Sequence, residues 1–115
     1  MIKALVAGVL LLMAALPGWT QTGQEQEFED DAVWIDVRSP RDYEQGHIEG
    51  AINIPHTDIS HRISDFVTDL YQPVHLYGST GTFAGLALEI LMEMGFQYVV
   101  NEGSYEAVLE RRKNQ

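Results

Sequence analysis

The chain has 115 residues, no cysteine and a formal net charge of -10, with 45% hydrophobic and 21% charged residues. This length suits one domain with a buried core, and the acidic balance argues against nucleic acid and anionic membranes as partners. A chain without cysteine can form no disulfide, no thiolate metal site and no thiol nucleophile.

Residues 1–20 have the pattern of a secretory signal peptide. A short start that contains Lys3 precedes an unbroken apolar run over residues 4–16, which is too short to span a bilayer. An uncleaved anchor or a buried N-terminal helix is the alternative. We expect export to the periplasm or another exported location, with cleavage before Gln21, although Thr22 could also serve as the last residue of the signal. Residues 21–31 would then form an acidic, flexible leader, and no membrane association would remain after the signal is removed.

The folded domain is predicted over residues 32–115. Apolar, mostly β-branched residues alternate over residues 33–37 and predict a strand. Ser39 and Pro40 then have the types typical of a helix cap and a first helical position. The short helix that they begin is predicted to end at Gly46.

A second short strand is predicted over residues 51–54, and a third, apolar strand over residues 74–77. Between them, residues 57–70 predict an amphipathic helix. The apolar side chains at helical spacing on its expected inner face are Ile59, Ile63, Phe66 and Leu70.

Residues 83–94 predict a long apolar helix. We expect it to be largely buried, with Met92 and Met94 filling the core. Residues 96–100 predict a further strand, and residues 101–103 a turn into a final helix. The alternation of strands and helices predicts a single α/β domain with a mainly parallel central sheet that is flanked by helices on both faces.

A polar loop leaves the third strand and enters the long apolar helix. In parallel sheets, ligands bind beyond the carboxyl ends of the strands. Convergent loop amides and the dipole of the following helix favour an anion at such a point. The expected anion-binding residues of this loop are Gly78, Ser79, Thr80, Gly81, Thr82 and Phe83.

Three stretches carry a resemblance to a known family: residues 36–40, residues 46–55, and residues 76–77 with the loop that follows. Together they resemble the rhodanese-like (sulfurtransferase) domains, in particular the small exported phage-shock-protein-E type. The resemblance covers roughly residues 32–112 and implies a rhodanese-like fold. In that family the first loop residue is a cysteine that carries sulfane sulfur as a persulfide, and this position corresponds to Gly78.

Gly78 has no side chain and cannot hold a sulfur atom. Thr82 and Phe83 also stand where many active members carry a basic residue. The resemblance therefore implies a domain without sulfurtransferase activity, which binds a small anion such as thiosulfate, or a protein. We expect no cofactor and no metal. A purely structural domain without a ligand is a further possibility.

The alternative is an active sulfurtransferase-related enzyme that uses an unrecognised group. Ser79 is the best candidate, but a serine needs a general base, and none of the four histidines has a spacing that marks it as one. We interpret Asp36 and Arg38 as a supporting ion pair that holds the turn beneath the loop. His47 and Asn53 are interpreted as structural residues of that turn.

Overall fold

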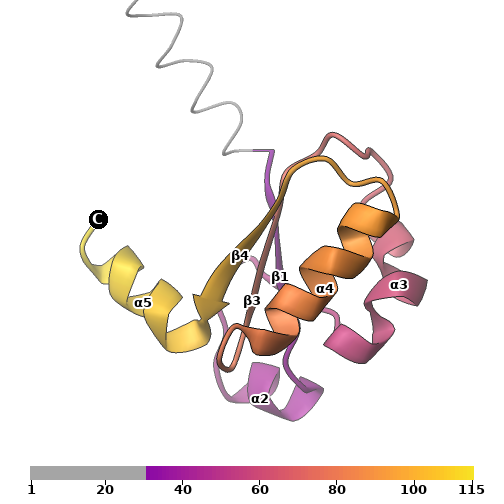
Figure 1. Cartoon of the computed structure of the whole chain (residues 1–115). Helices are drawn as coiled ribbons and strands as arrows, with labels where there is room; N and C mark the ends of the chain where they lie inside the picture. The colour runs from indigo at the N-terminus through magenta and orange to yellow at the C-terminus, as the bar shows by residue number, and fades with distance from the viewer. Residues whose placement is uncertain (1–30) are drawn as a thin grey trace, which may run out of the picture. The chain divides into compact units, whose positions relative to one another are not determined.

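Residues 31–115 are described by a computed structural model in which helices and strands alternate (Figure 1). The predicted signal peptide and nearly all of the predicted leader lie outside the described residues, so both stay predictions. Residues Ala32–Gln115 form one compact unit. The elements in chain order are β1 (Val33–Asp36), α2 (Pro40–Gln45), β2 (Ile52–Asn53), η1 (His56–Asp58), α3 (Ile59–Arg62), η2 (Ile63–Asp65), β3 (Val74–Gly78), α4 (Thr82–Glu93), β4 (Val99–Ser104) and α5 (Tyr105–Lys113).

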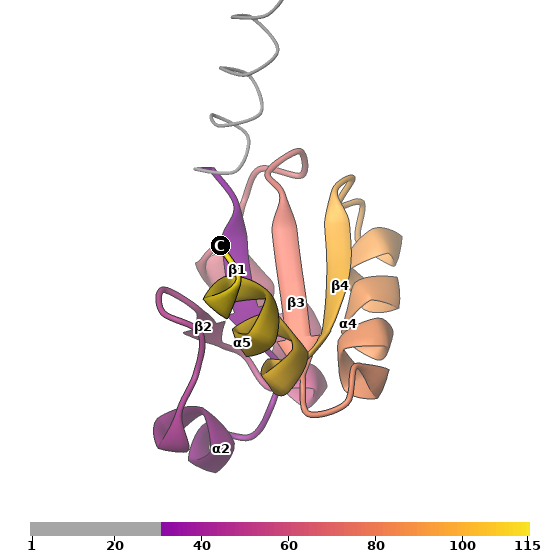
Figure 2. The same cartoon turned by 90° about the vertical axis from the view of Figure 1, so that its left-hand side faces the viewer.

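The four strands form a parallel sheet in the order β2-β1-β3-β4 (Figure 2). Val33 of β1 pairs with Val74 of β3, and Asp36 pairs with Tyr77. The carboxyl ends of the two central strands therefore lie side by side at the same edge of the sheet. This arrangement confirms the predicted α/β fold with a parallel sheet.

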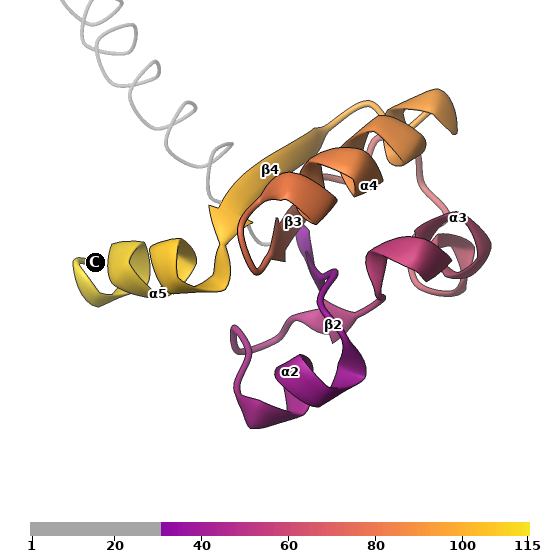
Figure 3. The ribbon, with the colours of Figure 1, turned by 60° about the horizontal axis from the view of Figure 1, so that its bottom comes forward.

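Helices cover both faces of this sheet (Figure 3). On one face, α3 and α4 pack over a core that includes Ile35 and Leu76. On the other face, Val108 of α5 packs in a second core with Tyr77. Successive side chains of a strand point to opposite faces, so Leu76 and Tyr77 belong to different cores although they are neighbours in the sequence.

The short helix α2 begins as predicted. The Ser39 hydroxyl accepts the Asp42 N–H at 3.2 Å, and Pro40 occupies the first helical position. Gly46 follows the helix with a φ of 152°, and its N–H donates to the Tyr43 carbonyl at 3.2 Å. This compact start and end direct the chain from the end of β1 back toward β2.

The helix predicted over residues 57–70 is wrong in length and continuity. The chain instead makes the 3-10 turn η1, the single α-helical turn α3 and the 3-10 turn η2, and then leaves helical structure. Phe66 and Leu70, which were expected in the core, are exposed, and Val67 is buried instead. The Gln97 N–H donates to the Leu70 carbonyl at 2.9 Å. This hydrogen bond holds the end of the segment against the loop after α4.

The expectation that the long apolar helix is largely buried is also wrong. Only Ala84, Ala87 and Leu91 of α4 are buried, whereas Met92 is 57% exposed and Met94 is exposed as well. The two methionines are therefore not core residues. An outer helix covers a sheet with one stripe of its surface, and its remaining side chains face solvent even where they are apolar.

The last strand is displaced from its predicted position. It runs over Val99–Ser104 rather than residues 96–100, and the turn expected over residues 101–103 lies inside it. Gly103 has a φ of 91°, and its N–H donates to the Asn101 side chain at 2.9 Å within an irregular part of the pairing with β3. Residue types that favour a turn have here produced a β-bulge.

Candidate functional site

The loop after β3 is shorter than predicted. Gly78 is the last residue of β3 and Thr82 is the first residue of α4, so only residues 79–81 lie between the two elements. Gly81 caps α4 with a φ of 89°, a conformation that favours glycine. The Asn101 side-chain amide of β4 donates to the Gly81 carbonyl at 3.0 Å and so fixes the loop against the sheet.

The loop presents backbone donors that are not used within the protein. Among the residues that the structure describes, none accepts a hydrogen bond from the backbone N–H of Ser79, Thr80 or Gly81. The Thr82 N–H reaches only the Thr80 hydroxyl, at 3.5 Å. Free N–H groups at the start of a helix of 12 residues can bind an anion, because the helix dipole adds partial positive charge there.

The turn between β1 and α2 faces this loop and contains the predicted ion pair. Asp36 is 0% exposed, and its carboxylate accepts hydrogen bonds from the Arg38 backbone N–H at 2.9 Å, Nε at 3.1 Å and Nη2 at 2.8 Å. The Asn53 amide donates to the carbonyls of both residues at 3.0 Å. Asn53 therefore has the structural role that was predicted, since it ties β2 to this turn.

The Arg38 guanidinium is held by several contacts. Its Nη2 also donates to the Gly46 carbonyl at 2.6 Å, and its guanidinium lies 4.3 Å from the centre of the Tyr105 ring. Burial by itself lowers the pKa of Arg38, but the hydrogen bond and the charge of Asp36 outweigh burial and raise it. The guanidinium thus stays charged and neutralises the buried Asp36 carboxylate, and the negative charge of Asp42 also favours its charged form.

Tyr77 of β3 is bonded to the segment between α2 and β2. The Ile48 backbone N–H donates to the Tyr77 hydroxyl at 3.0 Å in the buried core under α5. Burial raises the pKa of Tyr77, and Asp36 raises it further through a hydrogen bond and its charge. The hydroxyl therefore stays protonated at neutral pH and serves as a fixed hydrogen-bonding group.

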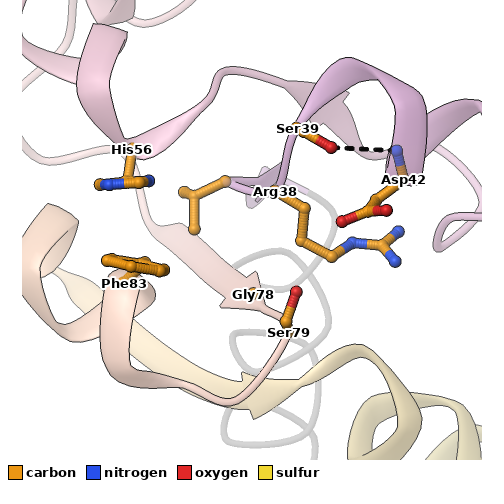
Figure 4. A pocket seen from close by; sticks show the side chains of 8 residues that line it. Arg38, Ser39, Asp42, His56, Gly78, Ser79 and Phe83 are labelled. Carbon is orange, nitrogen blue, oxygen red and sulfur yellow. Dashed lines mark hydrogen bonds between the residues drawn. The ribbon is translucent and has the colours of Figure 1, made fainter.

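A pocket of about 230 Å³ opens between the two turns (Figure 4). One of its walls is a pair of stacked rings: His56 and Phe83 lie 4.0 Å apart with 15° between their planes. Pocket volumes for drug-sized ligands are about 300–1,000 Å³, so this pocket suits a smaller molecule. The lining residues are Val37, Arg38, Ser39, Asp42, His56, Gly78, Ser79 and Phe83.

The structure gathers only some of the predicted site residues in this pocket. Gly78, Ser79, Phe83 and Arg38 line it, whereas Asp36 lies behind Arg38. The remaining predicted loop residues shape the loop but do not line the pocket; they are Thr80, Gly81 and Thr82.

Sequence reasoning missed four lining residues: Val37, Ser39, Asp42 and His56. His56 follows a proline and precedes a short helical segment, and nothing in that local pattern indicates a ring stacked on a residue of α4. Ser39 was predicted as a helix cap, and a cap at the carboxyl end of a central strand is itself a signal of proximity to the site.

No histidine is placed to activate Ser79. Within residues 31–115, no hydrogen bond joins the Ser79 hydroxyl to a histidine, and the His56 ring is stacked on Phe83. His47 Nδ1–H donates to the Tyr43 carbonyl at 2.8 Å and the ring stacks on the Tyr43 ring, in keeping with its predicted structural role. The described part of the chain contains no group of three or more histidine, aspartate or glutamate side chains that could hold a metal ion, and no helix long and apolar enough to cross a membrane.

Comparison with known sequences identifies relatives of this chain. The family model described as a rhodanese-like domain matches residues 20–111. Thiosulfate sulfurtransferase PspE of Escherichia coli (strain K12) is 44% identical over 75 residues, which cover 65% of this chain and 72% of PspE. The uncharacterized protein YqhL of Bacillus subtilis (strain 168) is 37% identical over 84 residues, which cover 70% of this chain and 65% of YqhL.

Solved structures show the same fold. A structure described as a rhodanese with anions from E. coli is 43% identical to this chain and superposes with a TM-score of 0.64. The match covers 66% of this chain and 89% of the E. coli chain. The human single-domain sulfurtransferase TSTD1 has a TM-score of 0.63 over 79% of this chain and 92% of its own. At 19% identity, the human protein supports the fold alone.

Proposed function

The chain belongs to the rhodanese-like domain family, and from that premise we propose that it is an exported member without sulfurtransferase activity. Its function is to bind, through the pocket between the two turns, a small anion of the thiosulfate type or a group on a protein. The observation that carries this proposal is Gly78 at the end of β3 in a chain that contains no cysteine.

Sulfur transfer needs an atom with a lone pair at this point. In the chemistry that the family resemblance implies, a thiolate attacks the outer sulfur of thiosulfate, a new S–S bond forms, and the old S–S bond breaks as sulfite leaves. Gly78 offers no such atom. The neighbouring Ser79 hydroxyl has no base to remove its proton among the described residues, and an unactivated hydroxyl is a weak nucleophile.

The rest of the site supports binding rather than turnover. The free N–H groups of residues 79–81 and the start of α4 favour an anionic group, and the adjoining pocket has room for a small molecule. Export is supported by the charged start and apolar run of residues 1–20. N-terminal sequencing of the protein from a bacterial periplasmic extract tests export, with a mature start near Gln21 expected and an intact Met1 contradicting it.

The proposed inactivity is tested by incubating the purified chain with thiosulfate. We expect no turnover of thiosulfate and cyanide above a heat-treated control, and no gain of one sulfur atom in the mass of the intact protein. Turnover that Ser79→Ala abolishes and Thr80→Ala preserves would instead establish the alternative, an active enzyme with an unrecognised nucleophile.

Gly78→Cys provides the matched positive control. The φ of Gly78 is not positive, and a Cβ there would lie 3.4 Å from Val37 Cγ2 and 3.7 Å from the Ala84 nitrogen, so a cysteine fits. Its thiol would stand at the start of α4, where a thiolate is favoured. We expect this variant to gain one sulfur atom from thiosulfate and to lose it to cyanide.

Ser79→Cys, with the thiol one position along the exposed loop, is the control for mere presence of a cysteine. We expect Gly78→Cys to form persulfide faster than Ser79→Cys. Both rates should be low, because Phe83 stands at the pocket and the loop itself contains no basic residue. Equal rates in the two variants would show that the loop does not favour an anion, which contradicts the binding half of the proposal.

A further inference from the structure

The face of the sheet on which α5 packs is only partly covered. Helix α5 lies over the part of this face where Val108 and Tyr77 pack together. In Figure 2, α5 crosses in front of the β1 side of the sheet and leaves β4 in view. The side chains of Tyr98 and Val100 are 47% and 43% exposed. The sheet therefore presents apolar surface that α5 does not cover.

A row of paired residues crosses this open face. Trp34 of β1 pairs with His75 of β3, and His75 pairs with Val100 of β4. Residues that pair across a parallel sheet carry their side chains on the same face. The rings of Trp34 and His75 are stacked, with their centres 4.6 Å apart and 7° between their planes. The row is therefore a flat floor that ends in an exposed aliphatic side chain at the edge of the sheet.

Two tyrosines extend this floor toward the start of β4. The Tyr98 carbonyl accepts the Val74 N–H at 2.8 Å, so the pairing with β3 already begins at Tyr98. Because side chains alternate along a strand, Tyr98 lies on the same face as Val100. The centre of the Tyr71 ring, which is 66% exposed, lies 6.4 Å from that of Tyr98. Such a surface suits an aromatic side chain of a partner.

Cations border this floor at the C-terminal end of α5. Arg112 is exposed, and its guanidinium lies 4.6 Å from the centre of the Trp34 ring. Within the described part of the chain it forms no ion pair. Arg111 pairs with Glu102 at 2.8 Å but stays 50% exposed, and Lys113 makes one exposed contact at 3.5 Å. Arg112 therefore offers a positive charge that the domain does not neutralise with an ion pair of its own.

This basic cluster stands out in an acidic chain. The chain has 17 acidic and 7 basic residues, and three of the basic ones are consecutive at residues 111–113. The helix dipole favours cations at this end of α5, but it does not account for the exposed apolar side chains beside them. Salt screens charges farther away than about 8 Å, so a group bound here responds mainly to the cluster. The cluster is complementary to carboxylates.

From these observations we infer that the open face binds an extended acidic segment of another protein, with an aromatic side chain between its carboxylates. The carboxylates meet Arg112 and Lys113, and the aromatic ring packs on Tyr98 and Val100. None of these residues lines the pocket between the two turns. The inference thus concerns a second surface and goes beyond the proposed function.

A second copy of this chain suits the same face less well. In a two-fold pair of copies, the same patch of each copy enters the interface. Residues 111–113 of both copies would then lie in one interface, where their positive charges repel. An acidic partner turns the same charges into attraction.

The test is an NMR titration of the isotope-labelled full chain with three acetylated pentapeptide amides. The probe has four carboxylate side chains around one phenylalanine. One control peptide carries side-chain amides in place of the carboxylates, and the other carries alanine in place of phenylalanine. We expect the probe to shift the backbone amide signals of residues 98–101 and the indole signal of Trp34. It should bind at least about fivefold more tightly than either control, because each control lacks one kind of contact.

Two variants and two matched controls locate the contacts. Arg112→Gln should weaken binding of the probe about threefold and leave the amide control peptide unaffected, as expected for an exposed ion pair. Arg41→Gln removes the same charge from the exposed surface of α2 and should change nothing. Tyr98→Ala should weaken the probe about fivefold. Phe66→Ala removes a ring that is also exposed, but on the segment after α3, and should leave binding unchanged. Amide signals outside residues 98–101 report whether each variant keeps the fold.

The outcomes separate this inference from the proposed function. Shifts confined to residues 79–83 would place the peptide in the pocket and overturn the inference, while the proposed function would stand. An absence of shifts with the probe, or equal binding of the probe and its amide control, would also overturn it. Sedimentation of the unsubstituted chain measures self-association. A dimer that Tyr98→Ala dissociates would show that a second copy covers this face and would overturn the acidic partner.

Discussion

The two turns that face each other across the pocket are built in opposite ways. At the turn after β1, the buried Asp36 bonds the partly buried Arg38, and Asn53 of β2 bonds the carbonyls of both. In the turn after β3, Ser79 and Thr80 are exposed and their backbone N–H groups have no partner in the described structure. The side chains of the first turn therefore contribute more to the stability of the fold than those of the second.

Asp36→Ala would break this contrast most severely. The change leaves the Arg38 guanidinium, which is 9% exposed, buried without its counter-charge. Removal of one partner of a buried ion pair costs about 3–5 kcal/mol, so we expect a loss of that size in the free energy of unfolding in urea. Glu110→Ala breaks the exposed pair with Lys113 and should cost no more than about 1 kcal/mol. Equal losses in both variants would refute the view that the first turn holds the fold.

Tyr77→Phe probes the same network with a smaller change. It leaves the buried Ile48 N–H without an acceptor, which costs about 1–3 kcal/mol of unfolding free energy at neutral pH. Because burial and Asp36 raise the pKa of folded Tyr77, the unfolded chain loses this proton first, near pH 10. The Tyr77 contribution is therefore complete below about pH 10 and is lost as the pH rises further.

Urea unfolding between pH 8 and roughly pH 11 checks the sign of this linkage. We expect the stability of the unsubstituted chain to fall more steeply above about pH 10 than that of Tyr77→Phe. Tyr71→Phe, at an exposed tyrosine, should keep the steep fall. Parallel curves for all three proteins would contradict a raised pKa at Tyr77.

Gly81→Ala tests the turn after β3. At a φ of 89°, an alanine costs about 1–2 kcal/mol, and its Cβ would also lie 3.3 Å from Gly103 Cα. Gly50→Ala has a similar φ, 85°, with no atom within 4 Å of the added Cβ, so it measures the backbone strain alone. In thermal unfolding, we expect Gly81→Ala to lose more stability than Gly50→Ala. A smaller loss at Gly81 than at Gly50 would refute the close packing of the loop against Gly103.

Ser79→Ala should have the smallest effect of all. Ser79 is exposed, and its hydroxyl donates to no described residue. We expect a change of less than about 0.5 kcal/mol in the free energy of unfolding, as for most surface positions. Calorimetry of this variant beside Thr80→Ala gives the measurement, and a loss above about 1 kcal/mol at Ser79 would show that the loop is held by contacts that the comparison omits.

The sequence predicted the parts of the fold that depend on local pattern and missed those that depend on tertiary contacts. Alternation in residues 33–37 and the cap at Ser39 are local, and both elements form near their predicted places. The helix predicted from residue 57 instead stops early because the chain is tied to the loop after α4, a partner that helical spacing cannot reveal.

The site divides in the same way. Gly78 at the end of β3 could be located from the motif alone, because the motif includes the strand that precedes it. The stacking of His56 on Phe83 and the position of Asp42 at the pocket could not, because three separate elements bring these side chains to one pocket.

The order of the strands also governs how the protein can fold. The central pairing joins Val33 to Val74, which are 74 − 33 = 41 positions apart, and β2 pairs with β1 over only two residues. A fragment that ends before β3 contains only the short β1–β2 pairing, which is too small to be stable. The chain between β1 and β3 must lose conformational entropy before the core contacts form. We therefore expect a single cooperative refolding step without a stable N-terminal intermediate, slower than that of a helical bundle of the same length.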